Sequence, residues 1–155
     1  MDAKRLLLIW GGHEGGRTEQ LRDAVLRGVA AAGSDICLRA KAALVATSGD
    51  LLWCEGLLMG TPEHFGYMSG ALKDFFDRTF YPVEGRTEGL PVGLFISAGN
   101  DGSGAAAAVE RISIGYRWKF IAPPVIVVGA PDAPALARVE ELGATMAVGL
   151  VAGVF

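Results

Sequence analysis

The chain has 155 residues, of which 51% are hydrophobic and 20% charged, a composition that suits one globular domain with its own core and excludes a disordered chain. Its formal net charge of -3 argues against nucleic-acid binding as the main task, so we expect no nucleic-acid partner. No apolar stretch reaches the ~20 residues that span a bilayer, and the first residues lack a signal-peptide pattern. We therefore expect a cytoplasmic protein without a membrane partner.

The first predicted strand covers residues 6–10, a continuous apolar run typical of a parallel strand that is buried on both faces. A glycine-rich turn follows over residues 11–18, and apolar side chains at helical spacing then predict a helix that closes at Gly33. Strand, glycine-rich turn and helix are the opening unit of a nucleotide-binding fold. A shorter strand is predicted over residues 36–38, and a short helix within residues 43–55.

Residues 57–60 form the third predicted strand, which leads into the most decorated turn of the chain. Gly60 and Gly66 allow close backbone approach, and Pro62 fixes one backbone angle. The helix predicted after this turn is marked on one face by Met68, Ala71, Leu72, Phe75 and Phe76. On its other face Asp74 and Arg78 are spaced for an i,i+4 ion pair. A polar link is predicted over residues 80–91.

The fourth predicted strand covers residues 92–97 and is followed by a polar turn and a helical stripe. Pro123 and Pro124 precede the fifth, over residues 125–128, at its start where no ladder bond is lost. A last helix follows. Strands that alternate with helices predict one α/β domain over residues 1–155, with a parallel sheet covered on both faces by helices.

The motif that runs from Gly60 to Arg78 reads Gly-Thr-Pro-x-x-Phe-Gly-x-Met-Ser-Gly-x-x-Lys-x-Phe-x-Asp-Arg. It resembles the isoalloxazine loop of the flavodoxin-like NAD(P)H-dependent FMN reductase family, and within it the WrbA-like NAD(P)H:quinone oxidoreductases. The resemblance implies a flavodoxin-like three-layer sandwich whose five-stranded parallel sheet has the order 2-1-3-4-5. It also implies FMN as the cofactor, NAD(P)H as the reductant and a quinone-like small molecule as the acceptor.

The turns after strands one, three and four lie at the same edge of a parallel sheet, where ligands bind. The first turn would hold a phosphate at a helix N-terminus. Against the Ser/Thr-x-Thr-Gly-Asn-Thr pattern of flavodoxin-like proteins, Gly16 and Thr18 match, whereas His13, Gly15 and Arg17 do not. Arg17 could compensate with a charged hydrogen bond, while the anionic Glu14 counts against the role. The alternative is a plain glycine-rich turn with solvated side chains.

Backbone amides of the second turn would hydrogen-bond the polar edge of the flavin ring. The third turn would contact the pyrimidine side of the ring or the ribityl chain. The alternatives are a packing role for Phe65, solvated side chains for Glu63 and His64, and a plain turn after strand four. The residues predicted to contact the cofactor are His13, Glu14, Gly15, Gly16, Arg17, Thr18, Thr61, Pro62, Glu63, His64, Phe65, Gly66, Ser97, Ala98, Gly99, Asn100, Asp101 and Gly102.

No catalytic side chain is predicted, because a flavin cofactor carries the hydride chemistry itself. No metal site is predicted either, because no His, Cys, Asp or Glu residues have metal-ligand spacing. Cys37 and Cys54 stand in apolar, strand-like contexts without a CxxC spacing, so both are expected to be buried thiols.

Two functions remain open. The first is an FMN-dependent NAD(P)H oxidoreductase that reduces quinones or similar two-electron acceptors. The alternative is a flavodoxin-like binding, electron-transfer or regulatory module with weak or no flavin binding. Residues 144–155 are apolar around much of their circumference, which predicts a homo-oligomer, a dimer or a tetramer. The alternative there is a helix end that is tucked into its own core.

Overall fold

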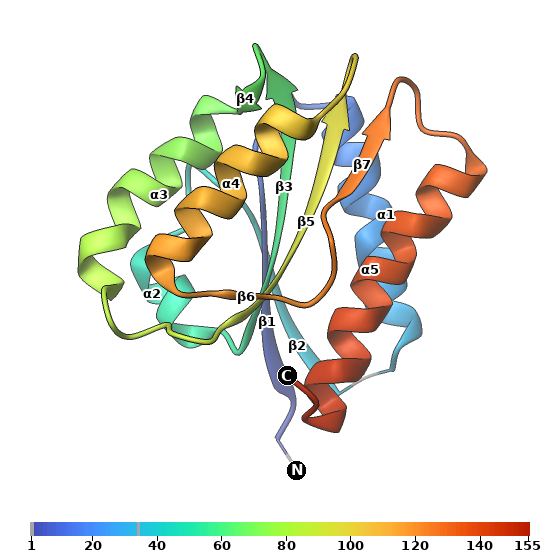
Figure 1. Cartoon of the computed structure of the whole chain (residues 1–155). Helices are drawn as coiled ribbons and strands as arrows, with labels where there is room; N and C mark the ends of the chain where they lie inside the picture. The colour runs from blue at the N-terminus through green and yellow to red at the C-terminus, as the bar shows by residue number, and fades with distance from the viewer. Residues whose placement is uncertain (1, 34) are drawn as a thin grey trace.

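Parallel strands form the centre of the sheet. In the computed structural model, which describes residues 2–33 and 35–155, they are β1 (Lys4–Trp10), β2 (Ile36–Ala42), β3 (Gly56–His64), β5 (Pro91–Ala98) and β7 (Val125–Val128). Each neighbouring pair is parallel, in the order β2-β1-β3-β5-β7 (Figure 1). The predicted strands and their 2-1-3-4-5 order are therefore confirmed.

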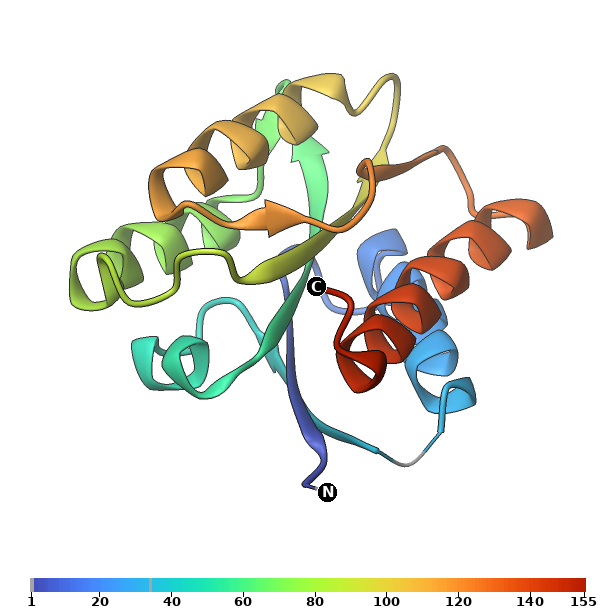
Figure 2. The same cartoon turned by 60° about the horizontal axis from the view of Figure 1, so that its bottom comes forward.

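Helices cover both faces of this sheet. On one face lie α1 (Arg17–Ala31) and α5 (Ala133–Ala152), and on the other α2 (Ser48–Trp53), α3 (Gly70–Val83) and α4 (Ser103–Tyr116) (Figures 1 and 2). Among the described residues, none of the helices has the length and apolar character needed to cross a bilayer. The result is the predicted sandwich of helix, sheet and helix layers.

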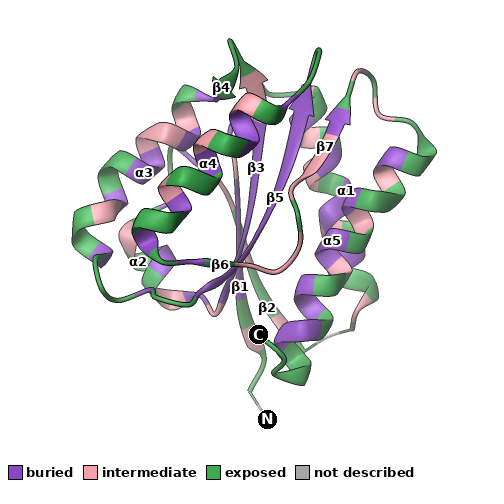
Figure 3. Ribbon diagram, in the orientation of Figure 1, coloured by how far each residue is buried: buried purple, intermediate pink, exposed green. Residues whose placement is uncertain are grey.

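The continuous apolar runs are explained by a core on each face of the sheet. Along β1, Leu6 and Leu8 pack with α1 and α5, while Leu7 and Ile9 pack with the helices of the other face. This alternation follows from the two-residue period of a strand. Figure 3 shows the central strands β3 and β5 buried along most of their length.

Within residues 2–33 and 35–155, the sheet has seven strands rather than the predicted five, because two strands of two residues each are added. β4 (Tyr67–Met68) pairs antiparallel with the end of β3, and β6 (Lys119–Phe120) pairs parallel with the start of β5. β6 and β7 lie along the two halves of β5, and Pro123 and Pro124 fall between them. Since proline has no N–H to donate, this edge of the sheet is interrupted there.

The predicted turn over residues 61–66 is wrong, because β3 continues to His64 and only Phe65 and Gly66 connect it to β4. Both have positive φ, 53° and 72°, as the two central residues of a tight hairpin turn require. Pro62 lies within β3, paired with Ser97 of β5. β1 pairs with β3 only as far as Gly60, so the missing N–H of Pro62 costs no ladder bond.

α3 also differs from the predicted helix at both ends. It begins after Ser69, whose hydroxyl oxygen accepts a hydrogen bond from the Leu72 amide (3.3 Å), so Met68 belongs to β4 and not to the helix. It then covers the first third of the predicted polar link and ends at Val83, with Pro82 in its last turn. The true link to β5 is therefore shorter than predicted.

Arg78 of α3 holds the segment that follows β2. The predicted pair with Asp74 is confirmed, with 2.6 Å between Arg78 Nε and Asp74 Oδ2. The other nitrogens of the guanidinium donate to the carbonyl oxygens of Ala46 and Ala43, each at 2.8 Å. Asp74 orients this planar group, and its bonds to the two carbonyl oxygens fix the segment against the helix.

The two cysteines lie in different environments. Cys54 is buried as predicted, and burial raises the pKa of its thiol to about 12. Cys37 is exposed, so its predicted burial is wrong. It lies on β2, the outermost strand of the sheet, which pairs with β1 alone. Both thiols are free.

Candidate functional site

The ends of β1, β3 and β5 surround a cavity of about 210 Å³. It is lined by His13, Gly16, Arg17, Thr18, Pro62, Glu63, His64, Ser97, Ala98 and Gly99. These residues come from all three segments that sequence reasoning singled out. Their predicted convergence at one edge of the sheet is therefore confirmed, whereas contact with a ligand stays a prediction.

The other residues predicted to contact the cofactor lie outside the lining of this cavity: Glu14, Gly15, Thr61, Phe65, Gly66, Asn100, Asp101 and Gly102. Thr61 is fully buried, and its hydroxyl oxygen accepts from the Ser69 amide (2.9 Å) while donating to the Pro62 carbonyl (2.8 Å). Its side chain therefore holds the hairpin to the start of α3. Asp101 accepts a hydrogen bond from the hydroxyl of Ser103, the first residue of α4.

The first loop presents free backbone amides to the cavity. α1 begins at Arg17 after the N-cap residue Gly16, and no side chain caps it. The first amides of a helix have no acceptor within the helix, and the helix dipole adds a partial positive charge there. Arg17 adds an exposed guanidinium at the same point. This end of the cavity therefore suits an anion.

One backbone amide of this loop already donates a hydrogen bond to a carboxylate. The Gly15 amide donates to Glu19 Oε1 at 2.6 Å, and Arg22 holds the other oxygen of that carboxylate at 3.1 Å. Arg22 in turn lies over the Trp10 ring, with 4.6 Å to its centroid. The Gly15 amide is therefore less available to a ligand than those of α1.

The first turn of α1 and the end of β5 are joined by two hydroxyl groups. Thr18 Oγ1 and Ser97 Oγ are 2.7 Å apart and hydrogen-bonded. Both residues line the cavity, yet they are only 3% and 7% exposed. The sequence predicted that Thr18 contacts the phosphate and that Ser97 contacts the pyrimidine side of the ring or the ribityl chain, and it did not predict their contact with each other.

The end of β3 and the start of α4 are joined by Glu63. Its carboxylate accepts hydrogen bonds from the amides of Gly102 and Ala105, each at 3.0 Å. These amides belong to the first turn of α4, whose N-cap residue Gly102 has no side chain to satisfy them. The side chain of Glu63 therefore caps α4, a role that was not predicted. A helix that opens after glycine, without a capping side chain of its own, was the available signal.

The hairpin between β3 and β4 rests on the same helix turn. A Cβ atom placed on Gly104 would lie 2.1 Å from the carbonyl oxygen of Gly66, so glycine is needed for this contact. Beside it Phe65 is fully exposed, which contradicts the alternative that it packs in the core. A large aromatic ring is thus held on a fixed hairpin next to the cavity.

Two histidines stand at the rim of the cavity. The rings of His13 and His64 come from different loops, and their centroids are 5.9 Å apart. Within the part of the chain that the structure describes, no group of three or more His, Cys, Asp or Glu residues could hold a metal ion. The pair is therefore suited to contact a polar ligand rather than to form a metal centre.

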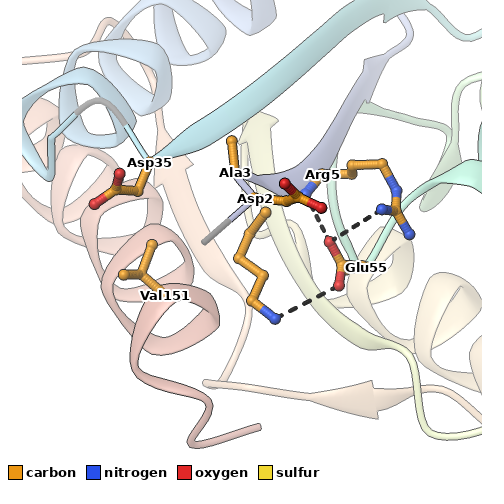
Figure 4. A pocket seen from close by; sticks show the side chains of 7 residues that line it. Asp2, Ala3, Arg5, Asp35, Glu55 and Val151 are labelled. Atoms are coloured by element: carbon orange, nitrogen blue, oxygen red, sulfur yellow. Dashed lines mark hydrogen bonds and ion pairs between the residues drawn. The ribbon is translucent and has the colours of Figure 1, made fainter.

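A larger cavity, of about 590 Å³, lies at the opposite edge of the sheet, near the start of β1 and the end of α5 (Figure 4). Glu55 accepts a hydrogen bond from the Arg5 amide (2.9 Å) and pairs with Lys4 Nζ at 3.6 Å. The Arg5 hydrogen bond is the main reason that the pKa of this carboxyl lies below its usual range. Because these charged groups satisfy one another, we favour the smaller cavity as the functional site.

The fold defines a flavodoxin-like protein. A flavodoxin from the domain Archaea superposes with a TM-score of 0.82 at 16% identity, over 95% of this chain and 99% of that one. A flavodoxin-type WrbA-like protein from Agrobacterium tumefaciens gives a TM-score of 0.75 at 15% identity, over 94% and 96% of the two chains. At such identities the likeness shows the fold alone.

The sequence comparison is more specific. The chain belongs to the NADPH-dependent FMN reductase family, whose sequence model matches residues 5–134. A curated relative, a flavodoxin from Aquifex aeolicus (strain VF5), is 32% identical over 98 residues, or 63% of this chain. The match covers 52% of that relative, so this chain spans about half of its length. The predicted family is therefore confirmed.

Proposed function

We propose that the protein is an FMN-dependent NAD(P)H oxidoreductase that reduces quinones or similar two-electron acceptors. The observation that carries the proposal is the cavity at the carboxyl ends of β1, β3 and β5, beside the N-terminus of α1. Membership of the NADPH-dependent FMN reductase family supports the same cofactor and the same reductant. The acceptor is proposed from the resemblance to the WrbA-like enzymes.

The residues present fit FMN. The free amides at the start of α1 and the Arg17 guanidinium suit its phosphate, and a Cβ on Gly99 would meet nothing within 4 Å, which leaves open space beside the cavity. The hairpin suits a flat ring, because it offers backbone polar groups and an exposed Phe65. When bound, FMN would supply a two-electron acceptor for hydride. The protein then has to bind and orient its ligands, and no side chain has to form a covalent bond.

Arg17→Ala should weaken FMN binding by about 1–3 kcal/mol, because a hydrogen bond from the guanidinium to a charged phosphate is lost. Quenching of flavin fluorescence measures the dissociation constant. Arg111→Ala is the matched control, since it removes an exposed arginine from α4, away from the cavity. Equal affinity in the wild type and the Arg17 variant would show that Arg17 is merely solvated.

The activity is tested by adding excess FMN to the purified protein and following NADH or NADPH absorbance with and without benzoquinone. We expect benzoquinone to accelerate oxidation of the reduced nicotinamide. We also expect ping-pong kinetics, because one open pocket lets donor and acceptor take turns. FMN binding no stronger than to an unrelated protein, with no acceleration by any acceptor, would refute the enzyme.

The second candidate is an electron-transfer or regulatory module of the flavodoxin type. Its specific support is the curated relative from Aquifex aeolicus, which is named a flavodoxin. The same experiment separates the two. A protein that binds FMN tightly but oxidises no reduced nicotinamide with any acceptor would be such a module.

Self-association also stays a proposal. Met146 and Leu150 of α5 are buried in the protein's own core, as the alternative foresaw, whereas Val148 and Val154 are 55% and 67% exposed. We expect light scattering at tens of micromolar to show a dimer or a tetramer, and Val148→Lys to shift it toward the monomer. Val45→Lys is the control, because Val45 is 64% exposed on another part of the surface. A wild-type protein that stays monomeric would refute the proposal.

A further inference from the structure

The hydroxyls of Thr18 and Ser97 are buried polar groups in the wall of the cavity. Thr18 stands in the first turn of α1, and Ser97 stands in β5, 79 residues further along the chain. Both are more than nine-tenths buried, and both line the cavity. A buried hydroxyl that lacks part of its hydrogen bonding destabilises a protein by about 1–3 kcal/mol. We therefore ask which partner the pair would have when a ligand is bound.

A count of hydrogens shows what the pair still lacks. Two hydroxyls carry two hydrogens, and the 2.7 Å bond between their oxygens uses one of them. The oxygen that accepts this bond keeps its own hydrogen. Neither hydroxyl has another hydrogen-bond partner within the described residues. One donor is therefore left over, on a pair that borders the cavity.

The surroundings of this donor decide which acceptor it suits. The amides that open α1 lack acceptors within the helix, and the Arg17 guanidinium lines the same cavity. All of these groups are donors, and together they favour a ligand group that only accepts. A phosphate monoester is such a group, with several strong acceptor oxygens and a negative charge.

We propose that the Thr18–Ser97 pair donates its remaining hydrogen to the phosphate of the bound ligand, so that Ser97 replaces a hydroxyl missing from the first loop. The proposal rests on the proposed function, in which that ligand is FMN. His13 and Gly15 stand where flavodoxin-like proteins carry hydroxyls, and Ser97 supplies one from a different strand. Ser97 thereby becomes a phosphate ligand rather than a contact of the flavin ring or the ribityl chain.

The proposal makes the pair a determinant of specificity between FMN and riboflavin, which lacks the phosphate. Ser97→Ala should weaken FMN binding about 10-fold, the loss expected for a hydrogen bond to a charged group. Thr18→Val should weaken it less, because Ser97 keeps the hydrogen that it donates to the phosphate. Riboflavin binding should stay within about twofold. Because the pair donates only one hydrogen to the phosphate, the double variant should lose little more FMN affinity than Ser97→Ala alone.

The experiment measures dissociation constants for FMN and riboflavin by fluorescence quenching, with thermal unfolding of the flavin-free variants to show that each is folded. Ser113→Ala is the matched control, because Ser113 is 1% exposed and donates to the Val109 carbonyl within α4, outside the cavity. This control should leave the affinities for both flavins unchanged.

Other results would overturn the proposal. Equal losses for FMN and riboflavin would place the pair on the ribityl chain or the ring, and unchanged FMN affinity in Ser97→Ala would remove its role. If the wild type binds neither flavin, the proposed function fails, and inorganic phosphate then tests the pair alone. A phosphate-induced NMR shift of the Thr18 amide that Ser97→Ala abolishes would support the pair, and no such shift in the wild type would refute it.

Discussion

Gly28→Ala is expected to lower the free energy of unfolding by about 3 kcal/mol, at the upper end of the range for overpacking a core. A Cβ on Gly28 of α1 would lie 1.9 Å from the carbonyl oxygen of Glu140 in α5, and one on Gly143 of α5 would lie 2.2 Å from the Val25 carbonyl oxygen. The two helices thus touch backbone to backbone. A backbone atom cannot rotate away, so an added methyl group must push the helices apart.

The control for this prediction is Gly115→Ala. Gly115 lies within α4, and a Cβ there would meet only the Phe80 ring, at 3.7 Å, which is ordinary contact. That variant should be more stable by up to about 1 kcal/mol, because alanine favours the helix. Chemical denaturation compares the two variants. Equal stability of Gly28→Ala and the wild type would mean that the helices can separate without cost.

Asp50→Ala is expected to cost about 3 kcal/mol as well. The Asp50 carboxylate is 3% exposed and accepts hydrogen bonds from Lys41 Nζ at 2.9 Å and Arg39 Nη1 at 3.0 Å. It also accepts from the Thr47 amide at 2.9 Å, which completes the reciprocal cap of α2. Loss of one cap costs about 1 kcal/mol, and hydrogen bonds to a charged group add about 1.5–3 kcal/mol.

This contribution depends on pH in a defined direction. Burial by itself raises the pKa of Asp50, but the hydrogen bonds from Lys41 and Thr47 outweigh it and hold the pKa below its ordinary value. A group with a depressed pKa in the folded state contributes stability that is complete above its unfolded pKa and is lost as the pH falls through the folded one. The gap in stability between wild type and Asp50→Ala should therefore be full at neutral pH and shrink below about pH 4. A gap that stays constant down to pH 2 would contradict the assignment.

The strands could be predicted from sequence because burial on both faces leaves an unambiguous pattern. The run around Leu7 has no polar position, as a strand between two helix layers requires. The extension of β3 to His64 could not be predicted, because Pro62 normally ends a strand. It is tolerated only because β1 stops pairing at Gly60, and that depends on a neighbouring strand.

The exposure of side chains on the edge strand β2 could not be predicted either, because it also depends on which strands lie next to it. Cys37 and Leu38 belong to an apolar segment, yet Leu38 is 39% exposed and Cys37 is exposed too, because β2 is the last strand of the sheet. Local composition does not say which strand is outermost. Strand order came from the family resemblance, and the resemblance said nothing of individual side chains on the edge.

In the candidate site, the meeting of three loops was predictable because parallel strands bring their carboxyl ends to one edge. The contacts among the loops were not. Glu63 caps a helix 39 residues further on, and Thr18 bonds to Ser97 across 79 residues. Such pairs have no local pattern, since each partner alone reads as an ordinary polar residue beside a turn.

The interrupted strand at Pro123 and Pro124 has a consequence for how the protein can associate. An exposed strand edge offers N–H and C=O groups on which a strand of another molecule can pair and start an aggregate. Here one edge is broken into β6 and β7, with two residues between them that cannot donate, and the other edge, β2, carries the charges of Arg39 and Lys41. Joining of sheets from separate molecules into a continuous ribbon is thus disfavoured at both ends. Any ordered assembly of this chain is therefore expected to form through its helices.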